Sequence, residues 1–435
     1  MSTPQFTVEA FHNGYLPEGG SEVDAIVSVT ASGLAGTAGT ATTEAAEVVM
    51  IDCSGSMGDP ATKIAAARRA TRAAIDALPD GVLLAVVAGR HDARMVFPQA
   101  ERMVVLDRVT RRQAHAAVDH LTPSGGTAIG TWLRLAQRLL APHPRRLRHA
   151  IMLTDGKDEH ETPEDLAAAL QACDGVFTCD ARGVGTDWVV QEVRGIAQTL
   201  LGTADIVAEP EHLAADFEGI VERAMGRGVG DVALRVWAPR GATVRSVKQV
   251  SPTVEDLTDR RTPDPAKPLI GLYPTGSWGD ETREYHVRIA LDPLAVGEEI
   301  LAARIGVAAP SLAEAGGALA ETRVPVTWTG DSALATRLNR RVAHYTGQAE
   351  LAEAIQEGLD ARRAGDLPTA TARLGRAVAL AAESGNAETS ALLEKVVEVQ
   401  DPATGRVRLR REVAAADEMT LDVRSTRTAR VREGS

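Results

Sequence analysis

The region from residue 44 to residue 227 alternates between short apolar runs and amphipathic stretches. The apolar runs at 47–52, 83–89 and 149–154 have the length of buried strands, and the stretches between them have helical spacing. Regular alternation of this kind predicts a doubly wound α/β fold, with a mostly parallel sheet covered by helices on both faces.

The flanking segments have a different pattern. Residues 5–31 are predicted to form two strands around a Gly/Pro turn, and residues 231–329 several strands with Pro-, Gly- and Asp-rich connectors. The first strands have no obvious partners unless they join the later ones. We therefore expect the α/β domain to be inserted into a β-sandwich and followed by a small helical domain. The predicted boundaries are sandwich strands at 1–43, the α/β domain at 44–227, the β-sandwich at 228–330, a helical bundle at 331–400 and an arginine-rich tail at 401–435.

That tail carries eight arginines and little apolar periodicity, which predicts a mobile arm or a terminal strand pair. The chain as a whole is acidic, with a net charge of −12 and only 3% aromatic residues. These values argue against a broad surface for nucleic acid or anionic membranes.

The sequence predicts a cytoplasmic protein. Its start has no basic and apolar leader segment, and no apolar run approaches the ~18 residues of a membrane-spanning helix. Cys53, Cys173 and Cys179 are an odd, sparse set, unlike a secreted disulfide framework. Many arginines, five lysines and abundant alanine are typical of a GC-rich bacterial source.

Candidate chemistry begins at the end of the first buried strand, where residues 47–58 read EVVMIDCSGSMG. Asp52, Ser54 and Ser56 place a carboxylate and two hydroxyls at every second position. These hard oxygen donors suit Mg²⁺ or Mn²⁺ better than zinc. Taken alone, the loop has a simpler interpretation, a turn in which Asp and Ser satisfy backbone amides or cap the next helix.

Two later loops complete a pattern. SGGTAIG, at 124–130, precedes an amphipathic helix and carries Thr127, and the apolar strand HAIMLTDG, at 149–156, ends at Asp155. Ligands of doubly wound sheets bind beyond the carboxyl ends of the strands. We therefore expect the three loops to meet in one crevice.

In order and spacing, the three loops resemble the metal-ion-dependent adhesion site (MIDAS) of von Willebrand factor type A (vWA) domains. The resemblance implies that Ser54, Ser56 and Thr127 contact a metal directly or through water. It implies that Asp52 and Asp155 act largely through bound water and hydrogen bonds. The expected metal is Mg²⁺, with Mn²⁺ or Ca²⁺ as alternatives.

Because hydroxyl ligands are neutral, such an ion stays under-neutralised, and an Asp or Glu of a partner can fill its open position. The sequence thus favours a non-catalytic, metal-dependent protein interaction module over an enzyme. Resemblance to cytosolic bacterial vWA proteins suggests a MoxR-type ATPase or a signalling protein as the partner. The alternative is a metal-assisted, phosphatase-like hydrolase. The loop from Asp52 superficially resembles the start of haloacid-dehalogenase phosphatases, but Ser54 stands where that family's pattern has a second aspartate. No Gly-x-Ser-x-Gly elbow is present either.

The surroundings of the loops allow further expectations. Residues 158–161 (DEHE) are predicted to be an exposed acidic loop on the rim rather than a zinc site. Arg90, His91 and Asp92 are also expected at the rim, and Cys53 is expected to be a buried small apolar residue facing away from the metal.

Overall fold

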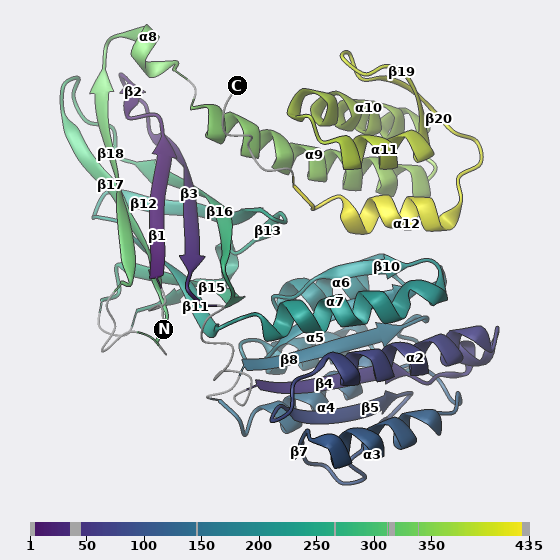
Figure 1. Ribbon diagram of the computed structural model, residues 1–435. Coiled ribbons are helices and arrows are strands. Elements are labelled where there is room, and N and C mark those ends of the chain that lie inside the picture. The colour runs from purple at the N-terminus through teal and green to yellow at the C-terminus, as the bar shows by residue number, and fades with distance from the viewer. Residues whose placement is uncertain are drawn as a thin grey trace. The chain divides into compact units, whose positions relative to one another are not determined.

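The computed structural model describes residues 5–34, 45–144, 147–264, 267–310, 312, 318–337 and 339–428. The chain divides into two compact units (Figure 1). The first comprises residues 33–230 and 276–279, and the second residues 4–32, 231–275 and 280–435. Residues 35–44, between the first predicted strands and the α/β domain, lie outside the described residues.

A mostly parallel sheet forms the centre of the first unit, in the order β10-β9-β8-β4-β5-β6, with β7 also paired to β5. Its strands are β4 (Ala45–Asp52), β5 (Leu83–Gly89), β6 (Ala93–Phe97), β7 (Val104–Val105), β8 (Leu147–Thr154), β9 (Thr178–Val184) and β10 (Ala204–Val207). β6 and β7 run antiparallel to β5, and the other neighbouring strands are parallel. This confirms the predicted α/β fold.

Helices cover both faces of this sheet. They are α2 (Thr62–Ala77), α3 (Arg108–Asp119), α4 (Ile129–Leu140), α5 (Pro163–Cys173), α6 (Val190–Thr199) and α7 (Leu213–Met225). α2, α3 and α7 share a core with Val49 and Ile51 of β4. Val48 and Met50 alternate with these residues and are equally buried, as expected for a strand covered on both sides. α4 packs against β4 and β5.

The second unit contains a β-sandwich. One sheet has the order β1-β3-β16-β12-β13, and the other has the order β14-β15-β11-β17-β18-β2. β1 packs closely against β18 of the second sheet. The strands of the first sheet are β1 (Gln5–His12), β3 (Glu22–Ser32), β16 (Glu281–Leu291), β12 (Ala242–Ser251) and β13 (Glu255–Asp256). Those of the second are β14 (Thr262–Pro263), β15 (Ile270–Trp278), β11 (Val229–Trp237), β17 (Glu299–Ala308), β18 (Ala320–Thr329) and β2 (Tyr15–Pro17).

Pairing between distant segments explains why the α/β domain is an insertion. β3 pairs antiparallel with β16, with Val27 opposite Tyr285 and Val29 opposite Arg283. β2 pairs with β18, on the other sheet. Strands that precede the α/β domain therefore complete both sheets of the sandwich, as the sequence pattern predicts.

The helical region follows the sandwich as α8 (Ser332–Ala335), α9 (Arg340–Arg363), α10 (Leu367–Ser384) and α11 (Ala387–Val396). The prediction for the tail needs correction. A strand pair is present, β19 (Val397–Asp401) with β20 (Arg406–Leu409), but it begins before residue 401 and is followed by helix α12 (Ala415–Arg424). Leu421 of α12 is fully buried in the helical core, and Asp422 accepts a 2.6 Å hydrogen bond from Arg363.

Two arginines of the tail contact the helical region: Arg427 Nη1 lies 3.6 Å from Glu388 Oε1, and Arg410 Nε donates to the carbonyl of Glu394 at 2.9 Å. Residues 429–435, which complete the predicted tail, lie outside the described residues. Among the residues that are described, no helix is both long and apolar enough to cross a bilayer.

A buried charged triad links three neighbouring strands of the α/β sheet near their amino ends. His149 of β8 has Nδ1 2.8 Å from Glu47 Oε2 on β4 and Nε2 3.0 Å from Asp180 Oδ2 on β9. Burial alone would lower the pKa of His149, but the charge of Glu47 and the hydrogen bond to Asp180 outweigh it and raise the pKa to about 9. The imidazole is therefore a cation at neutral pH, held between two carboxylates.

This triad predicts a loss of stability at alkaline pH. The pKa of His149 is raised from 6.5 to about 9 on folding, so its contribution to the free energy of unfolding, about 3 kcal/mol, is complete below pH 6.5. It disappears as the pH rises through 9. Thermal unfolding of the wild type and of His149→Gln, compared from pH 6 to pH 10, measures this contribution to stability.

The variant leaves the buried carboxylate of Glu47 without its cation, which costs about 3–5 kcal/mol near neutral pH. We expect the difference in Tm between the two proteins to shrink steadily above pH 7. A difference that stays constant up to pH 10 would show that His149 is neutral in the folded state.

Candidate metal site

Asp52 lies at the carboxyl end of β4 and connects two of the three predicted loops. Its carboxylate is fully buried, with Oδ1 accepting a 2.8 Å hydrogen bond from the backbone N–H of Ser54 and Oδ2 accepting one of 2.8 Å from Thr154 Oγ1. Burial raises the pKa of Asp52, and the hydrogen bonds from Ser54 and Thr154 oppose that rise. The same carboxyl group thus fixes the turn after β4 and the end of β8.

The predicted ligands form a continuous set of oxygens. Ser54 Oγ lies 2.9 Å from Ser56 Oγ, which donates a 2.7 Å hydrogen bond to Asp155 Oδ1. A Cβ atom added to Gly156 would lie 3.4 Å from Thr127 Oγ1 and 3.5 Å from Ser56 Oγ. Ser56 is therefore hydrogen-bonded directly to Asp155, and the hydroxyls of Ser56 and Thr127 both border the position beside Gly156.

Backbone hydrogen bonds hold the loop of Thr127 against the loop after β4. The N–H of Gly55 donates to the carbonyl of Gly125 at 2.9 Å, and that of Ser124 donates to the carbonyl of Cys53 at 2.7 Å. Gly125 has φ +79°, a conformation that favours glycine. The structure therefore brings together all five residues that the sequence singled out: Asp52, Ser54, Ser56, Thr127 and Asp155.

Lys63 was not recognised in the sequence as part of the site. It lies in the first turn of α2, and its Nζ is 2.8 Å from Asp155 Oδ2 and 3.6 Å from Asp187 Oδ2. Burial would lower the pKa of Lys63, but the hydrogen bond and the charge of Asp155 outweigh it and raise the pKa. A lysine in the first turn of a helix is usually solvated. The sequence therefore gives only one indication that Lys63 belongs to the site, its closeness to Ser56.

The rim loop, residues 158–161, is only partly the exposed acidic loop that the sequence predicts: Glu159 and His160 are exposed, but the other two residues are not. The Glu161 side chain is only 5% exposed and accepts a hydrogen bond from the N–H of Gly130, and Asp158 is half-buried with Oδ1 3.4 Å from the N–H of Ile129. Both carboxyl groups thus accept from the first turn of α4, whose free N–H groups and dipole attract them. The backbone N–H of His160 donates to the backbone carbonyl of Thr127 at 3.0 Å, which also holds the rim loop against the loop of Thr127.

Residues at the end of β5 support the loop of Thr127 rather than facing only solvent. The carbonyl of Arg90 accepts from Trp132 Nε1 at 2.7 Å and from the N–H of Ala128 at 2.9 Å. The Arg90 guanidinium donates to the carbonyl of Thr122 at 2.9 Å. Cys53 is fully buried as predicted, and burial raises the pKa of its thiol to about 12, so no thiolate is available there.

The oxygen set fits a hard divalent cation. Three hydroxyls and two carboxylates are the donors that Mg²⁺ prefers, and the neutral hydroxyls leave positive charge on a bound ion. Within the described part of the chain, no group of three or more His, Cys, Asp or Glu side chains is placed to hold a metal. The three loops offer a different kind of site, rich in hydroxyls.

Sequence and structure comparisons identify the family of the chain. The family described as von Willebrand factor type A domain matches residues 46–206, and the von Willebrand factor type A C-terminal domain matches residues 379–425. A solved structure of a von Willebrand factor type A protein from Catenulispora acidiphila is 50% identical, covers 98% of each chain and superposes with a TM-score of 0.92. The chain belongs to the von Willebrand factor type A family.

A more distant structure, the ArnB paralog VWA2 from Sulfolobus acidocaldarius, shares 14% identity over 98% of each chain, with a TM-score of 0.60. At that identity the likeness concerns the fold of this vWA chain alone. No curated protein matches the sequence. Domains of the vWA family commonly bind a divalent metal at the MIDAS and often mediate metal-dependent protein interactions.

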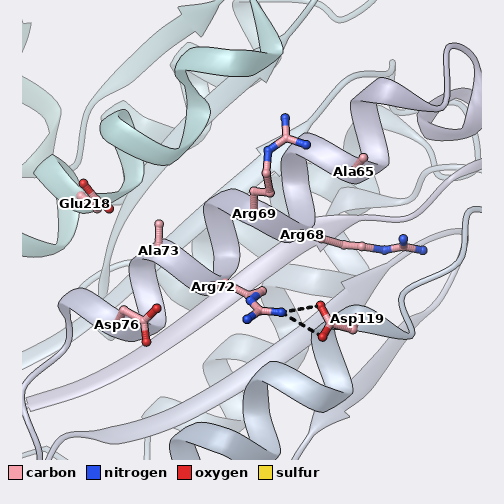
Figure 2. Close-up of a pocket in the computed structure, with 8 residues that line it drawn as sticks. All are labelled: Ala65, Arg68, Arg69, Arg72, Ala73, Asp76, Asp119 and Glu218. Atoms are coloured by element: carbon pink, nitrogen blue, oxygen red, sulfur yellow. Dashed lines mark hydrogen bonds and ion pairs between the residues drawn. The ribbon is translucent and has the colours of Figure 1, made fainter.

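A hollow of about 430 Å³ lies elsewhere in the vWA domain, along the outer face of α2 (Figure 2). Its lining residues are Ala65, Arg68, Arg69, Arg72, Ala73, Asp76, Asp119 and Glu218. Arg72 Nη1 lies 3.0 Å from Oδ1 and 2.9 Å from Oδ2 of Asp119, with which it forms an ion pair. Asp76 Oδ1 lies 3.0 Å from His115 Nε2. None of the five predicted metal ligands lines this hollow, and its basic and acidic groups balance.

The rim loop of the vWA domain predicts a stabilising substitution. Burial, followed by the hydrogen bond and charge of Glu161, raises the pKa of Asp158 to about 8. A carboxyl group whose pKa is raised on folding destabilises the folded protein. This effect grows as the pH rises from about 4, the pKa of the group in the unfolded chain, towards 8. Asp158→Asn keeps the side-chain shape without that charge, so its Tm should exceed that of the wild type at pH 8 and match it near pH 4.

Asp174→Asn is a suitable control, because Asp174 follows α5 and is exposed. Differential scanning calorimetry at the two pH values separates the variants. A lower Tm for Asp158→Asn at pH 8 would mean that Asp158 acts there as a stabilising carboxylate.

Proposed function

We propose that this protein is a non-catalytic interaction module that binds an Asp or Glu of a partner protein through Mg²⁺. The proposed ligands of the ion, direct or through water, are Asp52, Ser54, Ser56, Thr127 and Asp155. One observation carries the proposal: Ser56 Oγ lies within hydrogen-bonding distance of both Ser54 Oγ and Asp155 Oδ1, beside the hydroxyl of Thr127. Mn²⁺ and Ca²⁺ also suit such oxygens.

The charge of the site supports an acidic ligand. The two carboxylates neutralise a divalent ion only if both lie close to it, and each already accepts hydrogen bonds, Asp52 from Thr154 and Asp155 from Lys63. An ion in this site therefore retains positive charge that a carboxylate from outside can neutralise. MoxR-type ATPases and signalling proteins are the partner classes that we would examine first.

Metal binding is expected to stabilise the fold. At about 100 times its dissociation constant, a ligand specific to the folded state adds about 2.7 kcal/mol to the free energy of unfolding. Mg²⁺ should therefore raise the Tm of the wild type by several degrees and that of Thr127→Ala far less. Calorimetry with EDTA and then with excess Mg²⁺ measures both.

Thr122→Ala is the matched control, because Thr122 is an exposed threonine before the same loop. It should respond to Mg²⁺ as the wild type does. An equal response of all three proteins would place the metal elsewhere, and no response in the wild type would contradict metal binding. Turnover of p-nitrophenyl phosphate that needs both Mg²⁺ and Thr127 would favour the hydrolase alternative instead.

A further inference from the structure

Lys63 brings a positive charge to the site in addition to that of any metal. Its Nζ donates to Asp155 Oδ2 at 2.8 Å, while Asp155 Oδ1 accepts from Ser56 at 2.7 Å. One carboxylate is therefore shared between the hydroxyl set on one side and an ammonium on the other. The Lys63 side chain is 11% exposed, so water screens this charge only weakly.

The side chain of Lys63 ends beside the loop after β9. Its Cε lies 3.9 Å from the position that a Cβ of Gly185 would take, against the loop after β9. Asp187 of the same loop lies 3.6 Å from Nζ, but its side chain is 72% exposed. Solvent therefore screens Asp187 strongly, and it balances the charge of Lys63 only in part.

Asp52 and Asp155 carry two negative charges and so balance at most one divalent ion, and the ammonium of Lys63 adds a further positive charge to the loaded site. Two cations that share Asp155 repel each other, which opposes metal binding. The same excess charge attracts an incoming carboxylate.

We infer that Lys63 couples metal binding to partner binding: it weakens the site's hold on the ion alone and strengthens the hold of the loaded site on an acidic ligand. This inference rests on the proposed function and adds to it a residue that sets both affinities. Because the coupling is a binding free energy, it is reciprocal, so an acidic ligand must also tighten metal binding.

The test is a Mn²⁺ titration of the full chain, followed by electron paramagnetic resonance of the free ion. Lys63→Gln keeps a hydrogen-bond donor near Asp155 but removes the charge, and should bind Mn²⁺ roughly tenfold more tightly than the wild type. Asp187→Asn removes the exposed countercharge and should bind Mn²⁺ a few-fold more weakly. Acetate, compared with chloride at equal ionic strength, should tighten Mn²⁺ binding more in the wild type than in Lys63→Gln.

Each outcome of the Mn²⁺ titration either supports or overturns the inferred role of Lys63. Unchanged or weaker Mn²⁺ binding by a folded Lys63→Gln would overturn the inference and leave the proposed function intact, because it would make Lys63 a positioning residue for Asp155. If Lys63→Gln does not fold, Asp187→Asn decides, and equal or tighter binding by that variant rejects the coupling. If neither the wild type nor Lys63→Gln binds Mn²⁺, the proposed function falls together with the inference.

Discussion

The parallel register of β4 with its neighbours β5 and β8 is the constraint on which the candidate site depends. β4 and β8 pair over nearly their whole length, with Ile51 opposite Leu153, so Asp52 and Asp155 emerge at the same edge of the sheet. The hydrogen bond from Thr154 to Asp52 then ties the two strand ends together at 2.8 Å. A shift of one residue in this pairing would turn Asp52 towards the opposite face and separate the loops.

Charged groups are buried at both ends of this sheet. Near the amino ends, Glu47, His149 and Asp180 form a closed triad in which the imidazolium contacts both carboxylates. At the carboxyl ends, Asp155 is paired with Lys63, and the hydroxyls of Ser56 and Thr127 border the position beside Gly156. Removing one member of a closed set of buried charges destabilises the fold, whereas an incomplete set of oxygens can accept a ligand.

The second unit shows why the α/β domain can be carried as an insertion. β3 leads into the domain and β11 leads out of it, and each is already paired within the sandwich, β3 with β16 and β11 with β17. The sandwich therefore closes through contacts of its own, between strands that are hundreds of residues apart in the sequence. None of its strands includes a residue of the metal loops.

The sequence by itself determined the fold class, the insertion and the five oxygen-bearing residues, because these depend on local periodicity and on spacing along the chain. It could not determine that Lys63 reaches Asp155, that Glu161 turns inward to the first turn of α4, or that α12 packs its Leu421 into the helical core. From the sequence alone, charged residues in loops and at helix ends are predicted to be solvated, because their partners are not known. Those partners lie from 31 to 92 residues away in the cases of Glu161 and Lys63, so only tertiary structure decides where the charges are buried.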